Sequence, residues 1–409
     1  MPSASSPEIV VSGLGVTSAI GRGRDAFKRA LMGGEHRFSV MQRPGRQHGD
    51  TRFLGAEIPP LGDIARLPRS WQRTTSLSAQ VAVATLSEAW DDAALDTVDG
   101  HRIGLVVGGS NLQQRETLLA RERCGEQLEH LRPSYGLSML DTDLCGVCTS
   151  VFGIQGFAMT VGGASASGQL AVLEAAEAVK AGRADVCIAL GALMDLSYWE
   201  CQGLRAMGAM GSARYADQPE LACRPFDRAR DGFIFGEACA ALIVERAGHR
   251  RIPRTPYAQL RGWSVHMDAN RNPDPSLDGE MRAIQQALDR AGVSPRDIDY
   301  VNPHGSGSQA GDETELNALR NCGLGHATLN STKSITGHGL TAAGAVEVAA
   351  TLLQFEAEAL HPSLNLDTPI ADGFDWVIGR RNGARLRHAL TLSFGFGGIN
   401  TALCLSRAA

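Results

Sequence analysis

The amino-acid sequence predicts an α/β protein built from two consecutive halves. Short β-branched or apolar runs alternate with helical patterns along the chain. Glycine is abundant, at 47 of 409 residues, and it follows several of the strand-like runs. A Pro- and Arg-rich connector, Gly248 to Pro256, divides the chain, and the same alternation resumes after it without a strong residue-level repeat. This alternation predicts parallel sheets covered by helices, with halves at residues 1–250 and 251–409.

The first half begins with a strand-like run and contains the longest irregular regions. The expected strands are residues 8–16, 102–108, 158–161, 185–190 and 240–245, and the expected helices are 25–32, 75–94 and 167–181. Residues 33–73 lack periodicity and are rich in Gly, Pro and Arg, which predicts surface loops. Residues 111–152 interrupt the strand–helix order with charged helical segments. Such an insertion is a candidate lid, cleft wall or dimer surface.

The second half repeats the pattern with fewer elements. The expected strands are residues 259–263, 298–302, 389–394 and 401–405, and the expected helices are 277–291 and 341–356. Two of these strands end directly in glycine-bounded turns, at residues 303–305 and 395–398. Because ligand sites in open α/β sheets lie at strand carboxyl ends, we expect functional residues there.

Composition excludes several classes of protein. A formal net charge of -5 argues against a nucleic-acid partner. No apolar run approaches the roughly 20 residues of a membrane span, and the N-terminus lacks a signal-peptide pattern. The 9 cysteines are therefore expected to be reduced thiols of a cytoplasmic protein. A single CxxC, at Cys145 and Cys148, has no second pair at metal spacing, so we expect no metal site.

A side-chain-poor turn, Thr160 to Gly168, precedes the helical pattern of residues 167–181. Ser165 lies at its tip, near the positive end of the helix dipole, where backbone N–H groups can face an oxyanion. The same small residues would also suit close packing without chemistry, so the turn alone does not decide.

Two histidines lie at element ends beside glycine. His304 follows the strand 298–302, and His338 comes five residues after Lys333, just before a Gly/Ala-rich helix. A nearby lysine charge disfavours protonation of a histidine, which then stays neutral and donates one N–H. A third turn, Gly395 to Asn400, leaves the backbone N–H of Phe396 free to face a cavity.

Together these stretches resemble the β-ketoacyl-ACP synthases, the condensing enzymes of the thiolase superfamily, over nearly the whole chain. The matching stretches are Val10 to Thr17, Arg224 to Asp227, Gly232 to Glu237, His304 to Glu315, Lys333 to Gly344 and Gly395 to Asn400. The resemblance implies a duplicated five-layer αβαβα thiolase fold and a homodimer. It also implies an acyl carrier protein (ACP) as partner, whose phosphopantetheine arm carries the substrate, and no cofactor bound by the enzyme itself.

The resemblance also implies residue roles. Ser306 and Ser308 match the hydroxyls that hold the arm. Phe396 matches the gating aromatic, whose N–H forms an oxyanion hole with that of Ser165. Asp312 and Glu315 match supporting carboxylates, Glu315 near the lysine.

One position departs from the family, because Ser165 stands where its members have a cysteine nucleophile. A helix N-terminus lowers a thiol pKa of about 8.5 enough to form thiolate, but a serine needs a general base. Acyl loading is therefore expected to be poor. Malonyl decarboxylation needs no nucleophile, only donors for the enolate oxygen. The chain thus resembles the serine-bearing decarboxylases of polyketide β-branching, which supply acetyl-ACP to a hydroxymethylglutaryl-synthase-like partner.

Three alternatives remain open from the sequence. Acyl transfer could run through acyl-Ser165 with His304 or His338 as base. The chain could instead be a non-catalytic partner of a ketosynthase, like a chain-length factor, although such a subunit has no need of the histidines. Ser165 could also be an engineered replacement of a cysteine.

Overall fold

A computed structural model describes residues 7–248 and 255–408 of the chain. The predicted boundary between the halves, at residue 250, and residues 249–254 of the predicted connector lie outside the described residues. The two predicted halves carry adjoining parts of a 12-stranded sheet. The first half supplies β1 (Ile9–Ser18), β9 (Ala238–Arg246), β7 (Val186–Gly191), β5 (Ile103–Gly108), β6 (Phe157–Val161) and the short β2 (Gly21–Arg22). The second half supplies β10 (Ala258–Met267), β17 (Ile399–Arg407), β16 (His388–Gly395), β11 (Tyr300–Asn302), β12 (Thr328–Leu329) and β14 (Asp375–Trp376).

The two parts of the sheet meet where β1 pairs with β10 over a short register, Ile9 to Val11 against Ala258 to Leu260. The predicted parallel pairing is correct for the outer strands. There β5 pairs in parallel with β6 and β7, and β11 with β12 and β16. It is wrong for the centre, where β9 runs antiparallel to β1 and β7, and β17 to β10 and β16. Only a tight turn joins β16 to β17, and parallel neighbours need a crossover of about a dozen residues.

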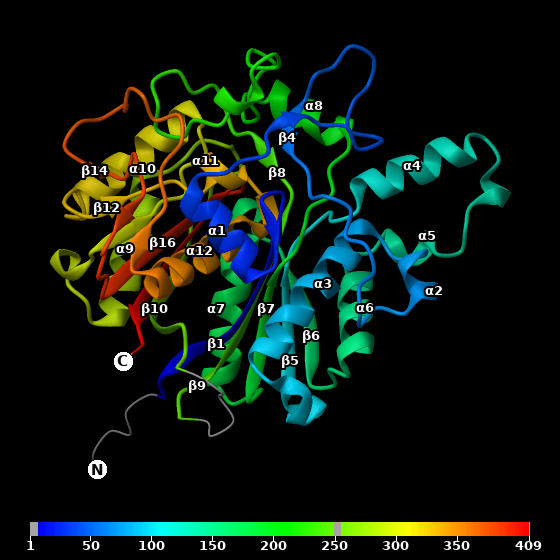
Figure 1. Cartoon of the computed structure of the whole chain (residues 1–409), viewed down its shortest axis with the longest axis horizontal. Coiled ribbons are helices and arrows are strands. Elements are labelled where there is room, and N and C mark those ends of the chain that lie inside the picture. Colours follow the sequence, from blue (N-terminus) through cyan, green and yellow to red (C-terminus); the bar gives the residue numbers. More distant parts are fainter. Residues whose placement is uncertain (1–6, 249–254, 409) are drawn as a thin grey trace.

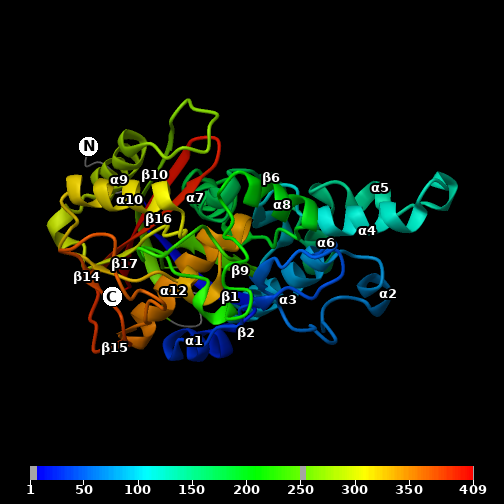
Figure 2. The ribbon, with the colours of Figure 1, turned by 90° about the horizontal axis from the view of Figure 1, so that it is seen from above.

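Helices cover both faces of each part, which produces five layers (Figures 1 and 2). The helices α3 (Leu77–Asp92) and α6 (Thr142–Phe152) form one outer layer, and α9 (Leu277–Ala291) and α10 (Gln309–Asn321) form the other. Between the sheet parts lie α7 (Ser167–Lys180) and α12 (Ala343–Ala357). The predicted αβαβα architecture is confirmed. The helices α10 and α8 (Tyr198–Ala206) were not predicted from the sequence, and α1 (Arg24–Gly33) matches the expected first helix.

The central helices α7 and α12 approach closely because their first turns contain glycine. A Cβ on Gly168 would lie 2.8 Å from the backbone nitrogen of Ala345, and one on Gly344 would lie 2.7 Å from that of Gln169. Real Cβ contacts are not that short, so both positions require glycine. This approach brings the turn that contains Ser165 against the segment that precedes α12.

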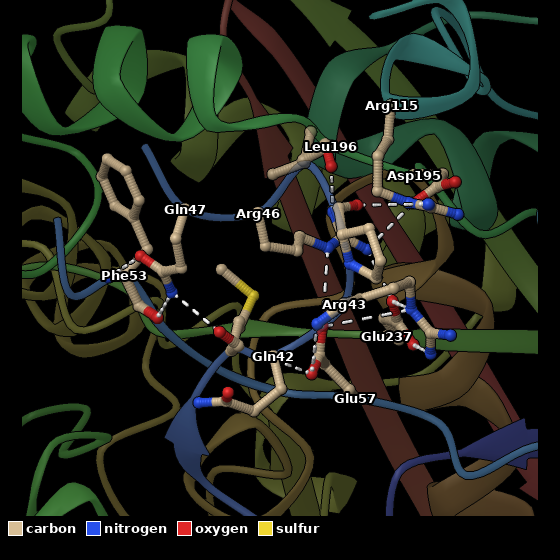
Figure 3. A network of polar contacts seen from close by, with 12 residues as sticks. Gln42, Arg43, Arg46, Gln47, Phe53, Glu57, Arg115, Asp195, Leu196 and Glu237 are labelled. Carbon is tan, nitrogen blue, oxygen red and sulfur yellow. Dashed lines mark hydrogen bonds and ion pairs between the residues drawn. The ribbon is translucent and has the colours of Figure 1, made fainter. Parts of the chain in front are cut away.

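The region 33–73, predicted as surface loops, contains a fully buried arginine. Arg46 is 0% exposed and bonds Asp195 at 2.9 Å and Glu237 at 2.5 Å. Arg43 also pairs with Glu237, and Arg115 pairs with Asp195, as Figure 3 shows. The prediction was wrong here because a charge can be buried where opposite charges and hydrogen bonds compensate it, and periodicity does not report such partners.

Three short strands form a separate small sheet beside the buried arginine network. They are β3 (Ser39–Val40), β4 (Leu54–Ala56) and β8 (Phe235–Gly236), and the four-residue helix α2 (Arg69–Gln72) follows β4 in the chain. A two-stranded sheet, β13 (Ala359–Leu360) with β15 (Arg381–Asn382), lies in the second half.

The insertion 111–152 divides into two parts. Its last helix, α6, belongs to the outer layer, whereas α4 (Gln114–Cys124) and α5 (Tyr135–Ser138) project from the body (Figures 1 and 2). Three apolar side chains on this projection are largely exposed: Leu128 at 73%, Leu137 at 63% and Met139 at 57%. Across the described residues, no helix is both long enough and apolar enough to span a membrane.

Candidate active site

Ser165 lies in a tight turn between β6 and α7. The turn is a short 3-10 segment, Ala164–Ala166, in which Ala164 has a φ of 46°, a strained value for a residue with a Cβ. The Ser167 hydroxyl holds the turn, since it accepts from Gly163 N at 2.9 Å and donates to Ala164 O at 2.7 Å. Ser165 is only 7% exposed, and it lines a cavity of about 460 Å³ together with His304 and His338.

His338 donates into this cavity. Its Nδ1 accepts a hydrogen bond from the backbone N–H of Leu340 at 3.1 Å. In a neutral imidazole the proton is then on Nε2, which lies 3.0 Å from the Oγ of Ser165. His338 therefore donates to Ser165 and has no lone pair available to take the serine proton.

The backbone of His338 is held by the strand segment beside it. His338 N donates to Ile234 O at 2.7 Å, and Gly236 N donates to His338 O at 3.1 Å. Glu237, the next residue, belongs to the buried arginine network described above. The network thus anchors the segment against which His338 is placed.

His304 is the same tautomer as His338, with the proton on Nε2. It lies just after β11, and Lys333 Nζ lies 3.4 Å from its Nδ1 and also donates to its backbone oxygen. Because an ammonium group can only donate, Nδ1 accepts and Nε2 has the proton. The two imidazole rings meet edge to face with centroids 5.4 Å apart. Two N–H donors therefore converge on one cavity.

Both histidines are neutral near neutral pH. Burial is the largest cause that lowers the pKa of His304 and His338 well below the usual range, and the charge of Lys333 lowers both further. The predicted neutral imidazoles thus follow from desolvation first and from the lysine second.

The carboxylate that pairs with Lys333 is Glu347 on α12, which the sequence analysis did not single out. Glu315 was expected near the lysine and lies close enough for the Lys333 charge to act on it, and its two oxygens accept from His304 N at 2.6 Å and Gly305 N at 2.8 Å. Glu347 is the one acid in the mostly apolar stretch 343–355 of α12, and this was the available signal in the sequence. Burial raises the pKa of Glu347 to about 7, against the effect of Lys333.

The loop after His304 lies along the cavity. Ser306 and Ser308 line the cavity and are linked, since Ser306 Oγ donates to Ser308 Oγ at 3.1 Å. Ser308 also caps α10 by accepting from Gly311 N at 3.2 Å. The buried Asp312 accepts from Gly307 N at 3.0 Å. This network fixes the loop and leaves the serine hydroxyls at the cavity wall.

The predicted turn Gly395 to Asn400 packs against the turn that contains Ser165. Ser393 Oγ donates to Ser165 O at 3.2 Å, and a Cβ on Gly395 would lie 2.2 Å from Gly163 O. Phe396, in the turn between β16 and β17, is 40% exposed and lines the same cavity. All residues predicted for the site are therefore brought to one cavity or to its immediate support.

The cysteines lie apart from this cavity. All nine are in the described residues and are free, and eight of them are buried. Cys145 of the CxxC contacts Thr160 Oγ1 at 3.4 Å, and burial raises the pKa of its thiol. The described part of the chain contains no group of three or more His, Cys, Asp or Glu side chains placed to hold a metal ion.

Two family models match the chain. The model "Beta-ketoacyl synthase, N-terminal domain" matches residues 6–249, and "Beta-ketoacyl synthase, C-terminal domain" matches residues 257–367. Two relatives are similar over the full length. The chain is 58% identical over 400 residues to "Polyketide biosynthesis malonyl-ACP decarboxylase PksF" of Bacillus subtilis (strain 168), covering 98% of this chain and 96% of the relative. It is 33% identical to "Putative polyketide beta-ketoacyl synthase 1" of Streptomyces halstedii, covering 98% of each.

Solved structures are similar over the same extent. A β-ketoacyl synthase from Burkholderia phymatum STM815 superposes with a TM-score of 0.89 at 27% identity, covering 98% of this chain and 100% of that one. A ketosynthase solved in complex with its type II polyketide acyl carrier protein superposes with a TM-score of 0.85 at 26% identity, covering 99% and 100%.

Proposed function

The chain belongs to the β-ketoacyl synthase family, and from this premise we propose that it decarboxylates malonyl-ACP to acetyl-ACP in polyketide biosynthesis. One observation supports this reaction above the others: the Nε2–H groups of His338 and His304 are both donors, because Leu340 and Lys333 occupy their Nδ1 atoms. The site can therefore stabilise an oxyanion but has no base next to Ser165. The relative PksF has the same activity in its name.

The chemistry requires only these donors at its first step. When the malonyl thioester binds, its carbonyl oxygen replaces Ser165 Oγ as the acceptor of the His338 Nε2–H and also accepts from the Nε2–H of His304. The bond between C2 and the carboxylate then breaks. Carbon dioxide leaves, and the bonding electron pair becomes an enolate whose negative oxygen receives both hydrogen bonds. A well-placed donor of this kind is worth about 2.7–4 kcal/mol in the transition state.

The same geometry speaks against acyl transfer through Ser165. A serine nucleophile must lose its proton to a base within hydrogen-bond reach. Its neighbour at 3.0 Å is the Nε2 of His338, which already has a proton. Before substrate binds, Ser165 instead accepts that hydrogen bond, and its own O–H stays available to the substrate.

An acyl carrier protein is the partner that this cavity suits. The thioester would enter on the phosphopantetheine arm, with Ser306 and Ser308 available to hydrogen-bond the arm and Phe396 at the turn beside it. Oxyanion contacts from the backbone N–H groups of Ser165 and Phe396 are part of the proposal. A ketosynthase with its acyl carrier protein bound is among the similar structures. The acetyl-ACP product would pass to a hydroxymethylglutaryl-synthase-like enzyme.

The chain is also proposed to form a homodimer. The strand β6 pairs with β5 on one side and is the last strand of the sheet in the described chain. Its residues, Phe157 to Val161, are mostly apolar and only half-buried or exposed. An exposed apolar edge of this kind is normally covered. No residue of the nearby insertion 111–152 lines the described cavity, so a dimer surface fits the insertion better than a lid.

The test is to mix the purified protein with malonyl-ACP and follow the carrier by intact mass. Conversion to acetyl-ACP above the carrier-only control is expected, with no acyl adduct on the enzyme. Absence of that conversion would overturn the proposal. A stable acyl-Ser165 species would instead favour acyl transfer. Light scattering of the same sample tests the dimer.

A further inference from the structure

A buried glutamate in the wall of the catalytic cavity has no role in the steps above. Glu280 lies in the first turn of α9, after the capping residue Ser276, and its side chain lines the cavity. It is 1% exposed, and its Oε2 has no hydrogen-bond partner among the described residues. A buried oxygen without a partner is costly unless something else satisfies it, such as a substrate or a water.

The surroundings of Glu280 disfavour its ionised form. It faces Glu315 and Asp312 on α10 and Asp268 at the end of β10. Burial first, and these carboxyl groups second, raise the pKa of Glu280 well above its usual range. Glu280 therefore holds a proton near neutral pH, in the cavity where the substrate reacts.

The other buried acids that line the cavity already accept hydrogen bonds from backbone N–H groups. Glu315 accepts two backbone N–H groups, and Asp312 accepts those of Phe226 at 2.6 Å and Gly307 at 3.0 Å. Each of these bonds favours a fixed carboxyl position. Among the buried acids that line the cavity in the described chain, Glu280 is the one with an uncommitted oxygen.

The proposed reaction has an unmet requirement for a proton. Loss of carbon dioxide leaves an enolate, which becomes an acetyl group only when its C2 is protonated. His304 and His338 cannot supply this proton without giving up the hydrogen bonds that hold the enolate oxygen. The hydroxyl of Ser165 and water are weak acids. A neutral carboxyl group is the strongest acid available at this wall.

We propose that Glu280 is the general acid that protonates the enolate carbon, directly or through one water. This inference rests on the proposed function. The O–H bond of Glu280 breaks and leaves its electron pair on the carboxylate, while the enolate electron pair forms the new C–H bond. Glu280 then regains a proton from water, so each turnover consumes one solvent proton.

The variant Glu280→Gln keeps the size of the side chain and removes the acid. Asp278→Asn is the matched control, because Asp278 is an exposed acid on the same helix turn, paired with Arg282. General acid catalysis contributes about 10²–10⁴-fold, so acetyl-ACP formation should slow by that range in Glu280→Gln and stay unchanged in Asp278→Asn. Glu280→Asp should restore part of the rate.

Two further readouts separate proton donation from a structural role. The ratio of CH₃ to CH₂D product formed in an equal mixture of H₂O and D₂O should change in Glu280→Gln, because water then becomes the donor. An infrared difference spectrum of the free proteins should show a protonated carboxyl in the wild type that Glu280→Gln lacks, whether or not the enzyme turns over.

The outcomes are distinguishable. If the wild type releases no carbon dioxide, the proposed function fails, and the role of Glu280 fails with it. If the wild type is active, and Glu280→Gln keeps its rate within about threefold and its isotope ratio, only the role of Glu280 is overturned. Absence of the protonated carboxyl band would overturn that role as well.

Discussion

Replacing His304 by alanine tests whether the two imidazoles, rather than Ser165, perform the reaction. The change removes the Nε2–H donor that Lys333 fixes, while the donor of His338 stays in place because Leu340 N holds it independently. It should therefore weaken stabilisation of the enolate oxygen without altering the elbow at Ser165. The comparison variant is Ser165→Ala, which removes the hydroxyl that accepts the His338 Nε2–H and that can donate to the substrate.

The expected magnitudes differ enough to decide. Loss of one oxyanion donor costs about 2.7–4 kcal/mol, which corresponds to about 10²–10³-fold in rate. Loss of one neutral hydrogen bond of the kind between His338 and Ser165 costs about 1 kcal/mol, or roughly fivefold. His304→Ala should thus lose at least about tenfold more rate than Ser165→Ala.

The assay is acetyl-ACP formation under single-turnover conditions, followed by intact mass of the carrier. His388→Ala is the control for an equivalent truncation, because His388 lies half-buried at the start of β16 and bonds Ser406 instead of lining the cavity. Thermal melts of all three variants establish that each is folded. Equal losses in Ser165→Ala and His304→Ala would refute the reasoning, since they would place Ser165 in the chemistry.

Further variants test the neighbouring claims. Ser165→Cys places a thiol at the helix N-terminus, and intact mass should show an acyl-enzyme adduct after incubation with acyl thioesters, where the wild type forms none. Absence of an adduct would contradict the assignment of position 165 as the family's nucleophile position. Lys333→Met leaves Glu347 buried without its partner, so the free energy of unfolding measured with denaturant should decrease by about 3–5 kcal/mol. A decrease below about 1 kcal/mol would count against a buried ion pair between Lys333 and Glu347. Burial raises the pKa of Glu315 from 4.5 to about 8. Between these two pH values the folded protein keeps a proton on Glu315 that the unfolded chain has already lost. As the pH rises from about 4.5 to 8, the free energy of unfolding should therefore fall more steeply in the wild type than in Glu315→Gln. Equal slopes of unfolding free energy against pH in the two proteins would refute the raised pKa.

The main site residues were predictable because they follow element ends. Ser165 and His304 come directly after strand-like runs, and His338 comes just before a helix, so residue order alone placed them at one edge of the sheet. Small residues around each position were visible in the sequence as well. The structure adds the reason for them, since Gly168 and Gly344 let the two central helices touch.

The supporting charges were not predictable in the same way. Glu347, Glu280 and Arg46 are buried, and the charged groups around them come from other elements of the chain. Periodicity reports which face of an element is apolar, but it does not report which distant charge compensates a buried one. The antiparallel centre of the sheet was missed for a related reason, because alternation of strands and helices does not specify which strands become neighbours.

The enolate formed at this site has two possible fates, and the residue at position 165 decides between them. In a condensing enzyme the enolate carbon attacks an acyl group held on the nucleophile. Here His338 donates to Ser165 and no base next to that hydroxyl activates it, so we expect no acyl group to be loaded there. The remaining fate is protonation, and Glu280 offers a proton from the wall of the same cavity. A serine at position 165 and a buried acid in the cavity wall therefore favour the same outcome, while the two imidazole donors serve the common first step.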